Sequence, residues 1–145
     1  MFDIKVERLV KKPIEEVFAA IADHANYANF PGVDESELVS QGENEPNGKG
    51  ALRRIKIKPF TLFERIVGFE RPTRLQYQIE QSSPITFDHE IGEVRLTEVE
   101  EGTRVVWISR GHLKVLLLGK WVLDPMTQKQ GAAGFASILK AIERQ

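Results

Sequence analysis

The C-terminal segment, residues 113–145, constrains the fold most, because its pattern differs from that of the long strand-rich region before it. The strand-like runs of that region alternate, whereas this segment carries an apolar series spaced i, i+3, i+4, i+7: Phe135, Ile138, Leu139 and Ile142. That spacing places four apolar side chains on one face of a helix. A long amphipathic helix after a run of strands predicts a curved antiparallel sheet that the helix closes on one side.

The first thirty residues predict one strand and two short helices. Phe2, Ile4 and Val6 alternate with charged residues, as in a half-buried strand. A helix is expected to open at Lys12-Pro13, because proline is tolerated at the first helical position. Its apolar stripe consists of Ile14, Val17, Phe18, Ile21 and Ala22. A second helical turn is predicted from 24 to 30, ended by Pro31-Gly32.

Strands and turns fill residues 33–112. Turn-forming sequences divide this region at Pro46-Asn47-Gly48, Lys58-Pro59, Arg71-Pro72, Ser82-Ser83-Pro84 and Glu101-Gly102. Most of the intervening runs are about ten residues long, which is typical of an antiparallel meander.

The last hairpin predicts which of its residues face the inside of the sheet. Glu100-Glu101-Gly102 fits a three-residue loop, which places Val99 opposite Thr103. In that register one face gathers the apolar side chains of Val94, Leu96, Val106 and Ile108. Its extension places Gly92 opposite Arg110 on the same concave face, so Arg110 is a candidate for the interior.

Composition narrows the class of protein. A chain of 145 residues, 41% of them hydrophobic, is expected to form a single domain over residues 1–145. Twenty basic and twenty-one acidic residues, without blocks of like charge, argue against a nucleic-acid partner. Cysteine is absent, which excludes disulfides and thiolate chemistry. No apolar run is long enough to span a bilayer, Val115–Leu118 included, and no signal peptide is apparent. We therefore expect a soluble cytoplasmic protein.

Local motifs and element order resemble the polyketide cyclase/START-like (SRPBCC) superfamily. This group includes START lipid-transfer domains, relatives of the birch-pollen allergen and aromatic polyketide cyclases. The resemblance covers nearly the whole chain. It rests on Pro13-Ile14-Glu15-Glu16-Val17-Phe18, on the segment 27–33 (YANFPGV), on Phe63-Glu64-Arg65-Ile66 with the following segment 71–77 (RPTRLQY), and on 102–107 (GTRVVW).

The resemblance implies an α+β helix-grip fold. In it, a curved antiparallel sheet of six to seven strands wraps around a long C-terminal helix, and two short helices follow the first strand. It also implies a cavity between sheet and helix. Superfamily members bind lipids, sterols, hormones, quinones or polyketides, and only some are enzymes, so the fold by itself does not assign an activity.

Polar side chains inside such a cavity would determine its specificity, because burying them is costly unless they are paired. Arg53 shares a strand face with Ile55, and Tyr77 lies between two apolar positions of its own strand. Glu64 is ambiguous, since both faces of its strand are equally apolar. We expect either an inward Arg53–Glu64 pair across neighbouring strands or a charge pair at the sheet rim.

The C-terminal helix adds two features. Gly131 and Gly134 either leave room for a ligand or allow close packing. At Asp124-Pro125 either a helix begins with Asp124 as N-cap or proline kinks a longer helix. The apolar segment Leu116–Leu123 then gates the cavity, contacts a membrane or second subunit, or forms core. The expected ligand-binding residues are Arg53, Glu64, Tyr77, Val106, Ile108, Arg110, Gly131 and Phe135.

The sequence contains no convincing catalytic set. His89 or His112 would have to be the base of a cyclase-type reaction, and no histidine spacing indicates a metal. No cofactor is expected. The favoured function is binding or transport of a small hydrophobic or amphipathic molecule, such as a lipid, quinone or aromatic metabolite. The alternatives are a cyclase/dehydratase-type enzyme and an interaction protein that uses Leu116–Leu123. A homodimer and a transient membrane contact are both compatible with the sequence.

Overall fold

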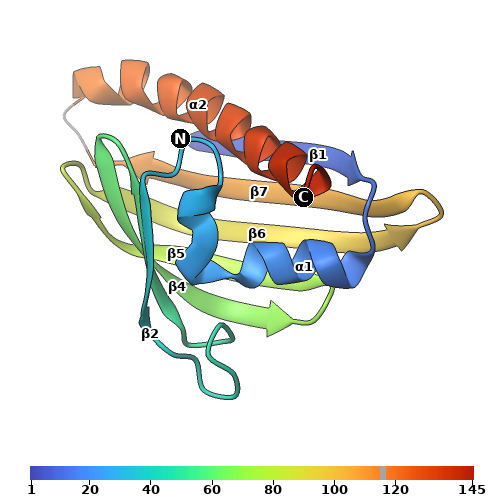
Figure 1. The fold of residues 1–145 in the computed structure, drawn as a ribbon. Coiled ribbons are helices and arrows are strands. Elements are labelled where there is room, and N and C mark those ends of the chain that lie inside the picture. The colour runs from blue at the N-terminus through green and yellow to red at the C-terminus, as the bar shows by residue number, and fades with distance from the viewer. Residues whose placement is uncertain (115–116) are drawn as a thin grey trace.

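The computed structural model describes the backbone of residues 1–114 and 117–145, and all side chains except those of residues 115–122. Its elements follow the predicted order (Figure 1). They are β1 (Phe2–Val10), α1 (Ile14–Ala22), the 3-10 helix η1 (His24–Asn29), β2 (Glu35–Ser40), β3 (Leu52–Ile57), β4 (Phe60–Glu70), β5 (Arg74–Ser83), β6 (Phe87–Val99), β7 (Gly102–Leu113) and α2 (Leu117–Glu143).

One seven-stranded antiparallel sheet, in the order β1-β7-β6-β5-β4-β3-β2, forms the body of the molecule. Helix α2 crosses one side of this sheet near β1 and β7, with α1 on the same side (Figure 1). Ile138, Leu139 and Ile142 of α2 are buried against the sheet. The predicted helix-grip architecture is therefore confirmed.

Helix α1 packs on the sheet next to the C-terminal end of α2 (Figure 1). All five residues of its predicted apolar stripe are buried. Phe18 meets Phe69 of β4 edge-to-face, with ring centroids 5.2 Å apart. Glu15 and Glu16 lie in the first turn, where the helix dipole favours negative charge.

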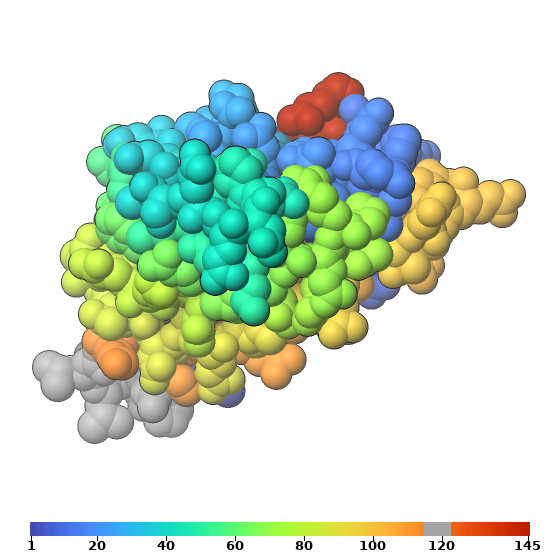
Figure 2. Space-filling model, turned by 90° about the horizontal axis from the view of Figure 1, so that it is seen from below, coloured from blue at the N-terminus to red at the C-terminus, as the bar shows by residue number. Residues whose placement is uncertain are grey.

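The predicted register of the last hairpin is wrong by one residue. Val99 pairs with Gly102, so only Glu100 and Glu101 form the turn. Trp107 is consequently opposite Val94, and Ser109 is opposite Gly92. The apolar pattern could not separate the two registers, because Val105 and Trp107 on one face are matched by Val106 and Ile108 on the other. The hairpin tip projects beyond the body in Figure 2.

Helix α2 is continuous through Pro125. Of the two alternatives for Asp124-Pro125, the longer helix that includes the proline is therefore the correct one, and Asp124 does not cap a helix start. Its Oδ1 instead accepts a hydrogen bond from the Leu113 amide at 3.2 Å, and its Oδ2 lies 2.8 Å from the terminal amine of Met1. The proposed flap, Leu116–Leu123, falls almost entirely on side chains outside the described part of the chain. Within the described residues, no helix is long and apolar enough to cross a membrane.

The loop between β2 and β3 packs against the body. Figure 2 shows it in teal beside the N-terminal helices. Arg71 Nη2 donates a hydrogen bond to Glu45 Oε1 at 2.6 Å, and His24 Nε2 lies 2.8 Å from the carbonyl oxygen of Asn47. The loop thereby reaches the interior and fixes the orientation of a buried histidine.

Candidate ligand-binding site

A cavity of about 310 Å³ lies between the concave face of the sheet and α2. Its lining is mainly apolar and includes Phe2, Ile4, Val33, Ile55, Phe60, Leu62, Ile79, Phe87 and Trp107. Phe135 of α2 stacks on Trp107, with centroids 4.2 Å apart and planes within 8°. The lining residues Pro31, Gly32 and Ile57 are exposed, so the cavity reaches the surface beside the η1–β2 connection.

Arg53 and Glu64 form a buried ion pair on the wall formed by β3 and β4. They are register partners, and Arg53 Nε donates to Glu64 Oε1 at 2.8 Å. The two side chains are only 2% and 9% exposed. This confirms the inward pairing and decides the ambiguity over the face of Glu64. Burial alone would lower the pKa of Arg53, but the Glu64 carboxylate together with Tyr27 and Tyr77 outweighs it and holds that pKa above its ordinary value.

Two tyrosine rings enclose the guanidinium group of Arg53. Its Cζ atom lies 4.8 Å from the ring centroid of Tyr27 and 5.0 Å from that of Tyr77. Cation–π attraction strengthens when the charge is desolvated, as here. Both rings therefore hold the Arg53 side chain in one orientation at the cavity wall.

His24 completes this network as a neutral acceptor. Its Nδ1 lies 3.1 Å from Arg53 Nη1, and a guanidinium can only donate, so Nδ1 must accept. The ring proton is then on Nε2 and is donated to Asn47 O. Burial, together with the charge of Arg53, lowers the pKa of His24 to about 3. We define His24, Arg53 and Glu64 as the arginine cluster.

A second polar group lies farther along the same concave face. Tyr77, Gly92 and Ser109 form one row across β5, β6 and β7. The Tyr77 ring lies flat over Gly92, where an added Cβ would come within 2.4 Å of it. This close approach carries the phenol toward β7, where Trp107 Nε1 donates to its hydroxyl oxygen at 3.0 Å.

His89 supports Ser109 in the same row. A bulge in β6 between His89 and Ile91 turns the His89 side chain to the concave face. The Ile79 amide donates to His89 Nδ1 at 3.1 Å, and His89 Nε2 lies 2.8 Å from Ser109 Oγ. Since Nδ1 accepts, Nε2 carries the proton and donates it to Ser109. Burial lowers the pKa of His89 to about 4.

Five of the eight predicted site residues line the cavity: Arg53, Glu64, Tyr77, Gly131 and Phe135. The other three, Val106, Ile108 and Arg110, do not, because the corrected register turns them to the convex face. Arg110 Nε lies 3.4 Å from Asp3 Oδ1 in an exposed pair. His112 also lies outside the lining, with Nδ1 3.9 Å from Asp124 Oδ2.

The two helix glycines differ in their surroundings. A Cβ on Gly131 would come within 2.4 Å of Ile4 Cδ1, so this glycine allows α2 to pack closely on β1. A Cβ on Gly134 would meet nothing within 4 Å, which leaves open space at the cavity. Each of the two sequence interpretations therefore holds for one glycine.

Sequence reasoning missed His24, Trp107 and Ser109 as parts of this site. Trp107 and Ser109 alternate along one strand face, but the register error assigned that face to the outside. His24 follows α1 without any periodic signal, and only the return of the β2–β3 loop makes it internal. Among the described residues, no cluster of three histidine or carboxylate side chains is arranged to hold a metal ion.

An antiparallel sheet gripping a C-terminal helix, with a mainly apolar cavity between them, defines the class of helix-grip proteins. Within it, the chain belongs to the family described as polyketide cyclase / dehydrase and lipid transport, whose model matches residues 1–145. Among proteins with curated descriptions, none matches this chain significantly in sequence.

Solved structures show the same fold at low sequence identity. The protein TTHA0849 from Thermus thermophilus superposes with a TM-score of 0.79 at 21% identity, covering 98% of this chain and 94% of that one. The ZhuI aromatase/cyclase from Streptomyces sp. R1128 gives 0.75 at 18% identity, with 98% and 93% coverage. A START superfamily protein from Mycobacterium smegmatis gives 0.72 at 12% identity, with 97% and 92% coverage. These similarities establish the fold alone.

Proposed function

We propose that this protein binds and carries a small, largely apolar molecule in the cytoplasm, and that the molecule occupies the cavity between the sheet and α2. The single observation that carries the proposal is the cavity itself, about 310 Å³ in volume and lined mainly by apolar side chains. Small-molecule sites combine such linings with a few convergent polar groups. The arginine cluster and the Tyr77–Ser109 row supply those groups.

The volume favours a compact ligand. An apolar protein cavity of about 150 Å³ accommodates benzene, so the present cavity is roughly twice that size. A molecule of about two fused rings fits this volume, whereas a lipid with two long acyl chains does not. Quinones and aromatic metabolites are thus favoured over diacyl lipids.

The proposed ligand contacts are Arg53, Glu64, Tyr77, Gly131 and Phe135, together with Trp107 and Ser109. The Phe135 and Trp107 rings provide flat apolar surface, and Tyr77 provides a phenol. Burial raises the pKa of Tyr77 above its ordinary value, so the phenol keeps its proton at neutral pH. Val106, Ile108 and Arg110 are not among the proposed contacts.

A cyclase/dehydratase-type enzyme is the second candidate, because titratable groups lie about 3 Å apart in the cavity wall. Arg53 is 2.8 Å from Glu64 and 3.1 Å from His24. Acid–base catalysis nevertheless needs a group that can exchange a proton near neutral pH. Arginine does not release its proton, and both nitrogens of His24 already have partners. This arrangement favours binding over catalysis.

Native mass spectrometry of the freshly purified protein tests the proposal. We expect one small molecule bound per chain. For protein stripped of ligand, we expect a quinone or flavonoid at about 100 times its Kd to raise the free energy of unfolding by about 2.7 kcal/mol. The corresponding rise in Tm is roughly 5–10 °C for a domain of this size. No bound molecule, and no shift with fatty acids, quinones or flavonoids, would contradict the proposal.

Substitutions at Gly134 test whether the cavity is the binding site. Gly134→Leu adds a side chain where the cavity is open, and we expect it to weaken binding of 1,4-naphthoquinone at least about tenfold by filling the ligand's space. Gly134→Ala is the matched control. It should preserve binding and raise stability by up to about 1 kcal/mol through helix propensity. Isothermal titration and urea unfolding measure the two effects. Equal affinity of both variants would place the ligand elsewhere.

A further inference from the structure

Two hydroxyl groups in the cavity each accept a hydrogen bond from the protein. The Tyr77 oxygen accepts from the Trp107 indole N–H at 3.0 Å. The Ser109 oxygen accepts from His89 Nε2 at 2.8 Å. The indole can only donate, and the Ile79 amide forces His89 to donate through Nε2. In both cases the direction of the hydrogen bond is fixed by the chemistry of the partner.

The protons of these hydroxyls have no protein acceptor among the described residues. A hydroxyl has one proton and two lone pairs, and among the residues that the structure describes each of these hydroxyls has only its donor as hydrogen-bond partner. Tyr77 and Ser109 are 4% and 5% exposed, so water does not freely replace a missing acceptor. Each hydroxyl therefore remains able to donate one hydrogen bond.

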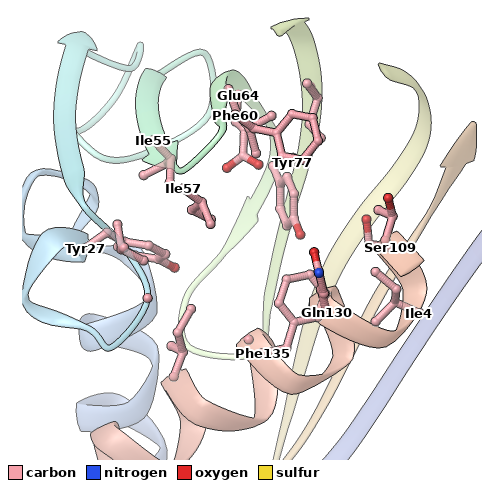
Figure 3. A pocket seen from close by; sticks show the side chains of 18 of the residues that line it. Ile4, Tyr27, Ile55, Ile57, Phe60, Glu64, Tyr77, Ser109, Gln130 and Phe135 are labelled. Carbon is pink, nitrogen blue, oxygen red and sulfur yellow. The ribbon is translucent and has the colours of Figure 1, made fainter. Parts of the chain in front are cut away.

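The two donors are neighbours. Trp107 and Ser109 are two residues apart on β7 and so point to the same face. The Tyr77 hydroxyl contacts Trp107, and the Tyr77 ring crosses Gly92, the register partner of Ser109. Figure 3 shows Tyr77 and Ser109 on the sheet side of the pocket and Gln130 on the helix side.

We propose that Tyr77 and Ser109 form a paired donor site that selects ligands bearing an acceptor oxygen, such as a ring ketone or quinone carbonyl. A ligand that offers no acceptor at this position leaves both hydroxyl protons without a partner. The preference deepens the proposed function and rests on it, since it concerns the same cavity. Trp107 and His89 act as positioning residues that fix the direction of the two donors.

Burial makes this selection effective. A buried donor without a partner costs more than the same donor in water, so a ligand that lacks an acceptor leaves two unsatisfied groups. A carbonyl oxygen has two lone pairs and can accept from both hydroxyls at once. The site thus discriminates by hydrogen-bond direction as well as by shape.

A matched pair of two-ring probes tests the inference by isothermal titration. 2-Acetylnaphthalene carries a carbonyl, whereas 2-ethylnaphthalene has nearly the same shape and no acceptor. We expect the wild-type protein to prefer the ketone about tenfold. Tyr77→Phe and Ser109→Ala should each weaken ketone binding about three- to tenfold and leave the hydrocarbon's affinity within about twofold. The double variant should bind both probes equally.

Infrared spectroscopy gives a readout that a purely structural role would not change. The carbonyl stretch of bound 2-acetylnaphthalene should lie at lower frequency in the wild type than in the double variant. Unchanged hydrocarbon binding shows that the variants are folded. If the wild type binds both probes equally, the donor site is refuted while the cavity function stands. If neither probe binds, the donor site is refuted, and native mass spectrometry with the thermal shifts decides the cavity function separately.

Discussion

Replacing Arg53 by methionine is expected to lower the free energy of unfolding by about 3–5 kcal/mol, because the change leaves the Glu64 carboxylate buried without its partner. Methionine has a similar length and adds no polar group, so lost packing contributes little. It also removes the donor to His24 Nδ1. Urea unfolding at pH 7 measures the effect.

Two further variants make this result specific. Arg54→Met removes an arginine at the next position of β3, whose partners Glu35 and Glu37 are exposed, and should cost about 1 kcal/mol or less. Arg53→Met combined with Glu64→Met removes both buried charges and should recover most of the loss. If Arg53→Met lowers the free energy of unfolding no more than Arg54→Met does, the Arg53–Glu64 ion pair does not stabilise the fold as proposed.

Acid should destabilise the protein well above the pH at which carboxylates titrate. The folded state lowers the pKa of His24 to about 3 and that of His89 to about 4, from an ordinary value near 6.5. Below pH 6.5 the unfolded chain therefore binds protons that the folded chain excludes. The free energy of unfolding has its full value above pH 6.5. It decreases as the pH falls toward about 4, the pKa of folded His89, and toward about 3, the pKa of folded His24. Each histidine contributes a slope of up to about 1.4 kcal/mol per pH unit.

Glutamine substitutions isolate each contribution, because a glutamine amide can accept and donate in the same two directions as these neutral rings. For His24→Gln and for His89→Gln, we expect the slope of unfolding free energy between pH 4 and 6 to fall by up to about 1.4 kcal/mol per unit. Urea unfolding from pH 4 to 8 gives the slopes, with the range above pH 7 as internal reference. A variant whose slope parallels the wild type would show that its histidine is not buried in the neutral form.

Local sequence was sufficient for the elements and for the inward faces of β3 and β5. Arg53 and Tyr77 alternate with apolar neighbours on a single face, and strand geometry turns that alternation directly into side-chain direction. Glu64 could not be oriented in this way, because both faces of β4 are apolar. Its buried partner on β3 decides its position.

The last hairpin shows the limit of such reasoning. The choice between a two-residue and a three-residue turn at Glu100–Gly102 moved Val106, Ile108 and Arg110 from the inside of the sheet to the outside. Local pattern could not make that choice, since a strand that is apolar on both faces fits either register.

The sequence by itself determined the helix-grip fold, the family resemblance, and the inward direction of Arg53 and Tyr77, because these follow from periodicity, turn residues and local motifs. Only the tertiary structure decided the hydrogen-bond directions at His24, His89, Tyr77 and Ser109. Those directions depend on groups distant in sequence, such as the Asn47 carbonyl and the Ile79 amide, which the folded sheet and the β2–β3 loop bring within 3.1 Å of a histidine ring. The cavity volume also depends on the tertiary structure, because the cavity is the space left between the sheet and α2 once α2 packs on β1.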